Sequence, residues 1–158
     1  MKSKTKTYVY GVLITLAVGG LSAFLTRNNM DVYESINKPA LAPPGFLFPI
    51  VWGILYVLMG ISIANVIVKG CEKGIYAVPC IKIYALQLAV NFFWSIIFFN
   101  FRAFLFSFIW LLFLWVLIII MIDCFSKATK FAAVINIPYF LWVSFAAYLN
   151  FAIYRLNL

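Results

Sequence analysis

Residues 104–125 have the sequence FLFSFIWLLFLWVLIIIMIDCF, in which Asp123 is the only charged side chain. The hydrocarbon core of a bilayer is about 30 Å thick and an α-helix rises about 1.5 Å per residue, so about 20 apolar residues cross it. Residues 104–125 therefore predict one membrane-spanning helix.

Similar apolar stretches lie before and after it, and the predicted spans are about 8–26, 46–68, 81–101, 104–125 and 132–154. The chain is 66% hydrophobic and 10% charged, against about 45–50% and 25% in soluble domains. Five spans use about 100 of the 158 residues, and further spans would leave almost no loops. The sequence thus predicts an all-α, five-transmembrane-helix bundle formed by residues 1–158 as one domain. This excludes a water-soluble enzyme and a disordered tail.

The first apolar stretch begins like a secretory signal peptide, because Lys2, Lys4 and Lys6 precede it and Ser22 and Ala23 lie near its end. It is longer than the apolar region of a usual signal peptide. Because a five-helix bundle also needs a first helix, we expect this stretch to be retained as a membrane span.

The longest polar stretch, residues 27–45, contains Pro39, Pro43 and Pro44 and predicts a structured loop outside the membrane.

Lysine and arginine are unevenly divided between the two ends of the predicted bundle. Eight lie on the side of the N-terminus: Lys2, Lys4, Lys6, Lys69, Lys73, Lys82, Lys127 and Lys130. Four lie on the opposite side: Arg27, Lys38, Arg102 and Arg155. Positive charge favours the cytoplasm, so we expect a cytoplasmic N-terminus and an outer C-terminus. No basic patch points to nucleic acid.

The chain contains no histidine, which removes the commonest general base and metal ligand. The cysteines do not have zinc-binding spacing, and we expect Cys71 and Cys80, in or beside one loop, to be free thiols. No metal site and no cofactor are therefore expected. Asp123 lies four residues before Lys127, which favours an ion pair at the membrane surface over a proton relay.

Polar side chains within the spans indicate which helix faces point inward. Gln87, Asn91 and Ser95 recur at a spacing of four, which predicts either hydrogen bonds between helices or the polar wall of a ligand cavity. Two other spans repeat this spacing, with Trp52 and Tyr56 in one and Pro138, Trp142, Ala146 and Asn150 in the other. Gly53 and Gly60 permit a close approach of a neighbouring helix, and the pairs Gly19–Ala23 and Gly60–Ala64 weakly favour a homodimer.

Three segments, 37–60, 85–95 and 137–150, carry distinctive motifs. They read NKPALAPPG followed by VWGILY and Gly60, ALQLAVNFFWS, and IPYFLWVSFAAYLN. Together they resemble the motifs of the TspO/MBR family of tryptophan-rich sensory proteins and translocator proteins, which includes the peripheral benzodiazepine receptor. The chain departs from the family where Val32, Leu41 and Phe151 stand in place of common tryptophans. Its C-terminus also fails the sterol-binding pattern, since Arg155 directly follows Tyr154.

The resemblance implies a five-helix bundle, often dimeric, whose pocket lies at one end beneath the loop after the first helix. Family members bind porphyrins such as protoporphyrin IX, benzodiazepine-site ligands and, in eukaryotes, cholesterol. Carried over by position, the implied pocket residues are Tyr33, Trp52, Asn91, Trp94, Trp142 and Ala146. Trp52 and Trp142 correspond to the indoles implicated in porphyrin chemistry in bacterial relatives.

These observations lead us to expect a membrane receptor or sensor for porphyrins and other hydrophobic ligands in a bacterial plasma membrane. Arg27 and Lys38 are candidate contacts for porphyrin propionates. Metal-free porphyrin should bind in preference to haem, because no histidine is present to ligate iron. Two alternatives stay open: an enzyme that degrades porphyrins in light with Trp52 and Trp142 as electron donors, and a tetrapyrrole transporter. The absence of an acid near the middle of a span argues against ion coupling.

Overall fold

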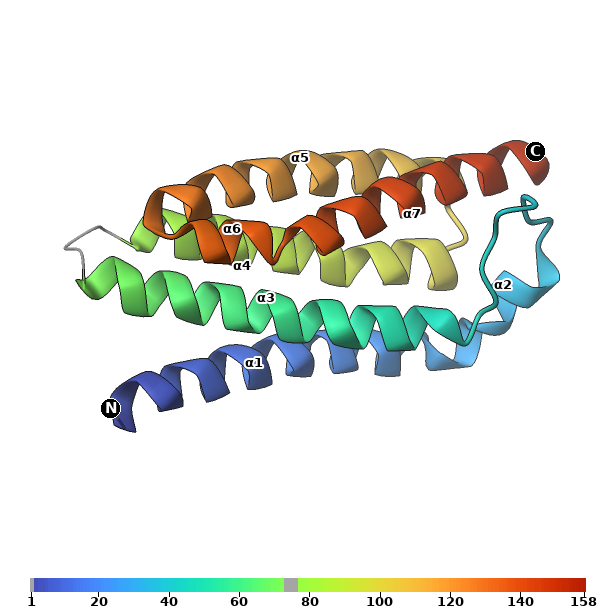
Figure 1. Cartoon of the computed structure of the whole chain (residues 1–158). Coiled ribbons are helices and arrows are strands. Elements are labelled where there is room, and N and C mark those ends of the chain that lie inside the picture. The colour runs from blue at the N-terminus through green and yellow to red at the C-terminus, as the bar shows by residue number, and fades with distance from the viewer. Residues whose placement is uncertain (1, 73–76) are drawn as a thin grey trace.

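The computed structural model describes residues 2–72 and 77–158, which form long helices lying side by side (Figure 1). The helices are α1 (Lys2–Thr26), α3 (Leu47–Glu72), α4 (Val78–Ser95), α5 (Phe104–Ala128) and α7 (Ile137–Leu156). A π-helical turn, η2 (Ile96–Asn100), continues α4, and a short helix, α6 (Lys130–Val134), precedes α7. Five helical segments are long and apolar enough to cross a membrane, the last combining α6 and α7. This confirms the predicted fold class, and no strand occurs in the described residues.

The segment between the first two spans folds into a cap over one end of the bundle. It contains the 3₁₀ turn η1 (Arg27–Asn29) and the short helix α2 (Asp31–Ser35), followed by non-helical chain that leads to α3. The two termini lie at opposite ends of the bundle, with the cap at the C-terminal end (Figure 1). We call this end the cap end and the opposite end the lysine-rich end.

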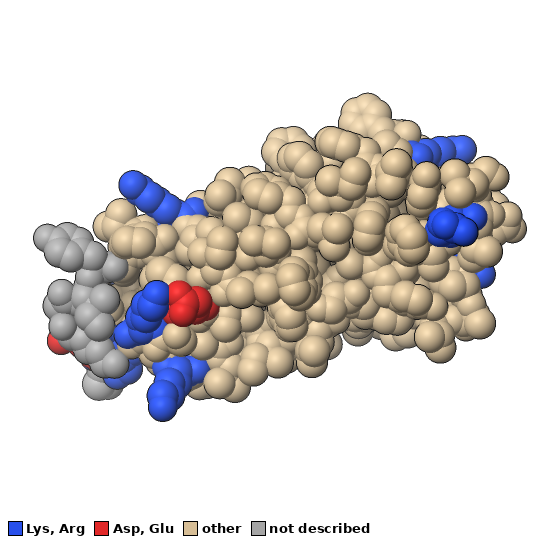
Figure 2. Space-filling model, turned by 90° about the horizontal axis from the view of Figure 1, so that it is seen from above, with Lys and Arg blue, Asp and Glu red and all other residues tan. Residues whose placement is uncertain are grey.

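Charged side chains are concentrated at these two ends, as expected for a membrane-spanning bundle. On the face shown in Figure 2, lysine, arginine and acidic side chains lie near the two ends and leave the middle free of charge. At the lysine-rich end, Lys4 of α1 and Lys69 of α3 both bind the carboxylate of Glu72. Lys73, which the sequence places at this end, lies outside the described residues. The orientation of the bundle in the membrane stays a prediction.

Helices α1 and α3 pack closely because glycine removes the side chain where they cross. A Cβ atom on Gly11 would lie 2.6 Å from the carbonyl oxygen of Gly60, and one on Gly60 would lie 2.5 Å from Cα of Val12. Gly60 thus allows close approach as predicted, whereas a Cβ on Gly53 would meet nothing. A Cβ on Gly19 would overlap the ring of Tyr56, so both small-residue pairs are used within the chain. They no longer argue for a homodimer.

The remaining helices close the bundle unevenly. Helix α4 packs on α1 and α5, and α5 packs on α7. Helix α3 packs on α6 near the lysine-rich end, but its approach to α7 is much looser, and the two ribbons diverge toward the cap end (Figure 1). The seam between α3 and α7 is therefore the loosely closed side of the bundle.

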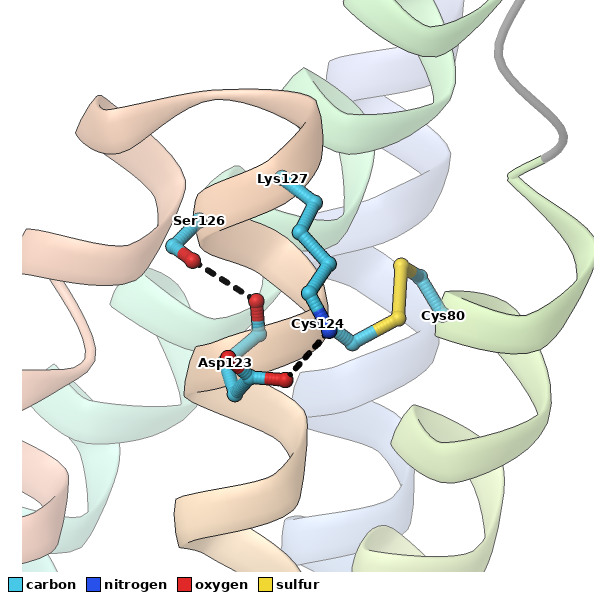
Figure 3. Close-up of a disulfide and its surroundings, with 5 residues drawn as sticks. All are labelled: Cys80, Asp123, Cys124, Ser126 and Lys127. Atoms are coloured by element: carbon cyan, nitrogen blue, oxygen red, sulfur yellow. Dashed lines mark hydrogen bonds and ion pairs between the residues drawn. A yellow bond between two sulfur atoms is a disulfide. The ribbon is translucent and has the colours of Figure 1, made fainter.

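A disulfide joins Cys80 in the first turn of α4 to Cys124 near the end of α5, so the expectation of a free thiol at Cys80 is wrong (Figure 3). The two Cα atoms are 5.7 Å apart because α4 and α5 are antiparallel, which brings residues 44 positions apart together. Cys71 is free and exposed, as expected. Beside the disulfide, Lys127 Nζ donates to the Asp123 carboxylate at 2.6 Å, which confirms the predicted ion pair.

Candidate ligand pocket

Two small cavities lie inside the bundle beneath the cap. The smaller has a volume of about 20 Å³ and is lined by Tyr33, Phe48, Trp94, Phe98, Phe99, Ala146, Leu149, Asn150 and Ile153. The larger has a volume of about 90 Å³ and is lined by Gly19, Ser22, Ala23, Thr26, Met30, Phe48, Pro49, Trp52, Tyr56, Trp94, Ser95 and Phe99. Phe48, Trp94 and Phe99 line both cavities, so the two are parts of one aromatic site divided by side chains.

Trp52 lies in a cluster of aromatic rings at the inner end of this site. Its ring stacks on Tyr56 with 5.6 Å between centroids and lies 6.4 Å from Trp94 and 6.2 Å from Tyr139. Trp94 in turn stacks on Phe98 at 5.6 Å. These rings come from α3, α4, η2 and α7, so helices far apart in sequence together supply flat apolar surfaces on which a planar ligand can stack.

A buried hydrogen-bond network lies among these aromatic residues. The Tyr139 hydroxyl donates to Gln87 Oε1 at 2.8 Å and accepts from Asn91 Nδ2 at 2.8 Å. The Tyr56 hydroxyl donates to Asn91 Oδ1 at 3.3 Å. For Gln87 and Asn91 the structure therefore shows hydrogen bonds between helices, and Asn91 lines neither cavity. Ser95, one turn further along α4, does line the larger one.

The indole N–H groups fall into two kinds. Trp110 Nε1 donates to the carbonyl of Val90 at 2.8 Å, and Trp115 Nε1 donates to Ser144 Oγ at 2.8 Å. Trp94 Nε1 and Trp142 Nε1 are buried and have no hydrogen-bond partner within the described part of the chain. An unpaired buried donor costs about 1–3 kcal/mol, so a ligand acceptor that reached either group would recover this loss.

The structure separates Trp142 from the other predicted tryptophans. Its ring packs edge-on against Phe48 at 5.9 Å and lies 5.8 Å from Phe145. Trp142 lines a groove on the lipid-facing side of the bundle instead of the two inner cavities. Phe48 lies between them, since it contacts Trp142 and lines both cavities.

The cap places Tyr33 over the pocket. Its side chain is buried, its hydroxyl donates to the carbonyl of Pro43 at 2.7 Å, and its ring packs edge-on against Phe48 at 5.0 Å. Burial, with a smaller contribution from the neighbouring Glu34 carboxylate, raises the pKa of Tyr33 above its usual value of 10.0. The phenol therefore remains a donor at neutral pH.

The two predicted propionate contacts have different surroundings. Lys38 Nζ donates to Glu34 at 3.1 Å and lies 4.7 Å from the centre of the Tyr33 ring, although Lys38 itself lines none of the cavities described here. The Arg27 guanidinium lies 3.9 Å above the exposed ring of Phe24 and lines none of the cavities described here. A mouth cavity of about 230 Å³ opens beside Tyr33, Glu34 and Phe48.

Sequence reasoning missed several residues of the site, chiefly Phe48, Phe98 and Phe99. Phe48 precedes Trp52 by four positions and so shares its helix face, a signal that was present in the sequence. Phe98 and Phe99 turn inward because the π-helical turn η2 shifts the register of α4, which no spacing rule for α-helices anticipates. No group of three His, Cys, Asp or Glu residues suited to a metal ion occurs in the described residues.

Comparison with known proteins agrees with this architecture. The model of the TspO/MBR family matches residues 11–155. The chain is 35% identical to "Tryptophan-rich protein TspO" of Chlorobaculum tepidum over 99% of both chains. It is 36% identical to "Protein CrtK" of Rhodobacter capsulatus, covering 79% of this chain and 78% of that protein. It is 33% identical to "Translocator protein" of Ovis aries, covering 79% and 74%. The chain is an integral membrane protein that belongs to the TspO/MBR family.

Proposed function

We propose that this protein is a membrane receptor or sensor that binds a flat tetrapyrrole of the protoporphyrin IX class beneath the cap. The observation that carries the proposal is the pair of buried, unpaired indole N–H groups, on Trp94 and Trp142, beside an aromatic cluster. Trp52 and Trp94 would stack on the macrocycle, and Lys38 beside the Tyr33 ring would meet a propionate. Related names, "Tryptophan-rich sensory protein" among them, support a sensory role.

The inner cavities, of about 20 and 90 Å³, are smaller than the usual ligand pocket of about 300–1,000 Å³. Binding therefore requires the aromatic side chains that divide the site to move apart. We expect Phe48 to move, because it lines both cavities. Its ring packs against the rings of Tyr33 and Trp142. Benzodiazepine-site ligands, which are also apolar and aromatic, would occupy the same opened space.

Titration of the purified protein with protoporphyrin IX in the dark tests the proposal. Trp94→Phe keeps an aromatic ring but removes the unpaired N–H, so affinity should fall by about fivefold, the equivalent of one hydrogen bond. Trp110→Phe is the matched control, because Trp110 Nε1 is bonded to Val90 and its ring lines neither cavity. Absence of binding by the unaltered protein contradicts the proposal, as does an equal loss in both variants.

A second candidate function is the light-dependent breakdown of porphyrins. It is favoured by the contact of Trp52 with Tyr56, Trp94 and Tyr139, three oxidisable rings whose centroids lie within 6.4 Å of that of Trp52. Trp52 would give one electron to the photo-excited macrocycle, leaving an indole radical cation and a reduced macrocycle, and dissolved dioxygen would be the oxidant that then breaks the ring. Illumination of the complex should then bleach the porphyrin, and Trp52→Phe and Trp142→Phe should stop bleaching while binding is retained. Retained bleaching in Trp52→Phe contradicts this candidate.

Transport of tetrapyrroles is the third candidate and would appear as flux into proteoliposomes. Asp123, which the sequence predicts to form an ion pair rather than a proton relay, is exposed near the lysine-rich end and pairs with Lys127, so it gives no support to ion-coupled transport. We also propose that the protein lies in a bacterial plasma membrane with the lysine-rich end in the cytoplasm. A homodimer is proposed from the family resemblance alone, because the small-residue pairs are used within the chain.

A further inference from the structure

The cap closes the water-facing end of the pocket through hydrogen bonds to the end of α7. The backbone N–H of Asn37 donates to Asn157 Oδ1 at 3.0 Å, and Asn157 Nδ2 donates back to the carbonyl of Asn37 at 2.9 Å. Asn37 Nδ2 also donates to the carbonyl of Leu156 at 3.3 Å. Together with the bond from Tyr33 to Pro43, these contacts tie the cap down over the pocket.

The side of the bundle facing lipid is open by comparison. A groove of about 410 Å³ lies at the loose seam between α3 and α7, within the membrane-spanning segments. Its lining residues are Val51, Ile54, Leu55 and Leu58 of α3 and Pro138, Leu141, Trp142 and Phe145 of α7. None of these side chains is charged, and the indole N–H of Trp142 is the one polar side-chain group among them. The volume falls within the range of small-molecule sites, about 300–1,000 Å³.

Two rings separate this groove from the inner cavities. Trp142 lines the groove, Phe48 lines both cavities, and their centroids are 5.9 Å apart. The N–H of Trp142 is unpaired within the described residues, so no hydrogen bond fixes the orientation of the indole. Trp115 shows the contrast, since its N–H is held by Ser144.

We propose that the groove between α3 and α7 is a lateral portal through which a bilayer-dissolved, planar aromatic ligand reaches the pocket, with Trp142 and Phe48 as the gate. This rests on the proposed function and names the route of access to the same site. A porphyrin macrocycle is apolar over both faces and partitions into lipid, so it meets the groove without leaving the membrane. When the gate rings turn aside, the groove, the gate and the inner cavities become one space, and the N–H of Trp142 is free to bind the arriving ring.

The test is kinetic, because a portal controls rates and not affinity. The protein is placed in phosphatidylcholine nanodiscs, and protoporphyrin IX binding is followed by porphyrin fluorescence in stopped flow. Ile54→Trp combined with Leu141→Trp fills the groove at two lipid-exposed positions. Association and dissociation should both slow by about tenfold, while Kd stays within about twofold of the unaltered protein. Ile109→Trp with Leu112→Trp, exposed on α5 and outside the groove, should leave both rates unchanged.

Each other outcome contradicts the proposal in a distinguishable way. Unchanged rates in the groove-filled variant, with normal binding, refute the portal and leave the pocket intact. A raised Kd with an unchanged association rate shows that the groove is a lipid or ligand site without a path inward. No binding by the unaltered protein refutes the proposed function, and the portal with it. Leu141→Phe is the milder variant should the double substitution fail to fold, and a twofold slowing of both rates is then expected.

Discussion

The two ends of the bundle are held together by different means. At the lysine-rich end, a disulfide joins α4 to α5, and Glu72 of α3 binds Lys4 of α1 and Lys69 of its own helix. At the cap end, the chain is held by hydrogen bonds between Asn37 and Asn157 and by rings packed around Phe48. Hydrogen bonds and ring contacts can be broken and remade locally. The pocket therefore lies at the adjustable end of a molecule whose other end is covalently fixed.

A labelling experiment with an all-or-none outcome tests on which side of the membrane the lysine-rich end lies. Positive charge predicts that the lysine-rich end is cytoplasmic, whereas disulfides are rare in the cytosol. Cys71, free and exposed near the end of α3, is a natural reporter of this end. We expect a membrane-impermeant maleimide to leave Cys71 unlabelled in intact cells and to label it after permeabilisation. Labelling in intact cells would reverse the predicted orientation and place the disulfide in an oxidising compartment.

Removal of the disulfide should have the largest effect on stability. Cys80→Ser opens the covalent link between residues 44 positions apart, and such a loss typically costs about 2–4 kcal/mol. Thermal unfolding in detergent measures it, with Cys71→Ser as the matched control because Cys71 is unbonded. Porphyrin affinity should be unchanged, since the pocket lies at the other end. A stability equal to that of Cys71→Ser would show that the covalent link does not hold this end.

Disruption of the buried polar network between the two ends should lower the stability by less than removal of the disulfide does. Tyr139→Phe removes the hydroxyl that bonds both Gln87 and Asn91, leaving two buried amide groups without this partner. The expected loss is about 1–3 kcal/mol of unfolding free energy. Tyr148→Phe, at an exposed position on the same helix, is the control. Equal midpoints for the two variants in thermal unfolding would contradict a stabilising role for the network.

Release of the cap should have the smallest effect, and a local one. Asn157→Ala removes the reciprocal bonds to Asn37, a local loss of about 1–2 kcal/mol. Amide hydrogen exchange over residues 36–46 should therefore quicken by about 5- to 30-fold, with the lysine-rich end unaffected. Asn29→Ala, which breaks a bond to Asn100 at the same end, should leave this segment unchanged. Unaltered exchange in Asn157→Ala would show that other contacts hold the cap.

The sequence predicted the helices well because lipid imposes a strong and simple requirement. Each span must be apolar and about 20 residues long, and FLFSFIWLLFLWVLIIIMIDCF meets both requirements for a membrane-spanning helix. The spacing of Gln87 and Asn91 likewise indicated an inward face, which the structure occupies with Tyr139. These features depend on neighbouring residues in one helix, and local periodicity reveals them.

Features that depend on two distant helices were not predictable. The bond between Cys80 and Cys124 depends on the relative height of α4 and α5, which are joined by a short turn in which Arg102 has a positive φ of 50°. To predict that Trp142 lies apart from Trp94, one would need to know that α7 diverges from α3. Both are properties of packing, and similar motifs in the sequence are compatible with more than one arrangement.

The central claim, that a planar ligand binds beneath the cap, is tested most directly by filling the smaller cavity. Ala146 lines that cavity, so Ala146→Leu would occupy the space that the ligand needs. We expect its Kd for protoporphyrin IX to rise by at least about tenfold, because the larger side chain would deprive the ligand of its packed contacts in this cavity. Ala152→Leu, on the same helix and outside both cavities, should bind like the unaltered protein. Normal affinity in a folded Ala146→Leu variant would contradict the account.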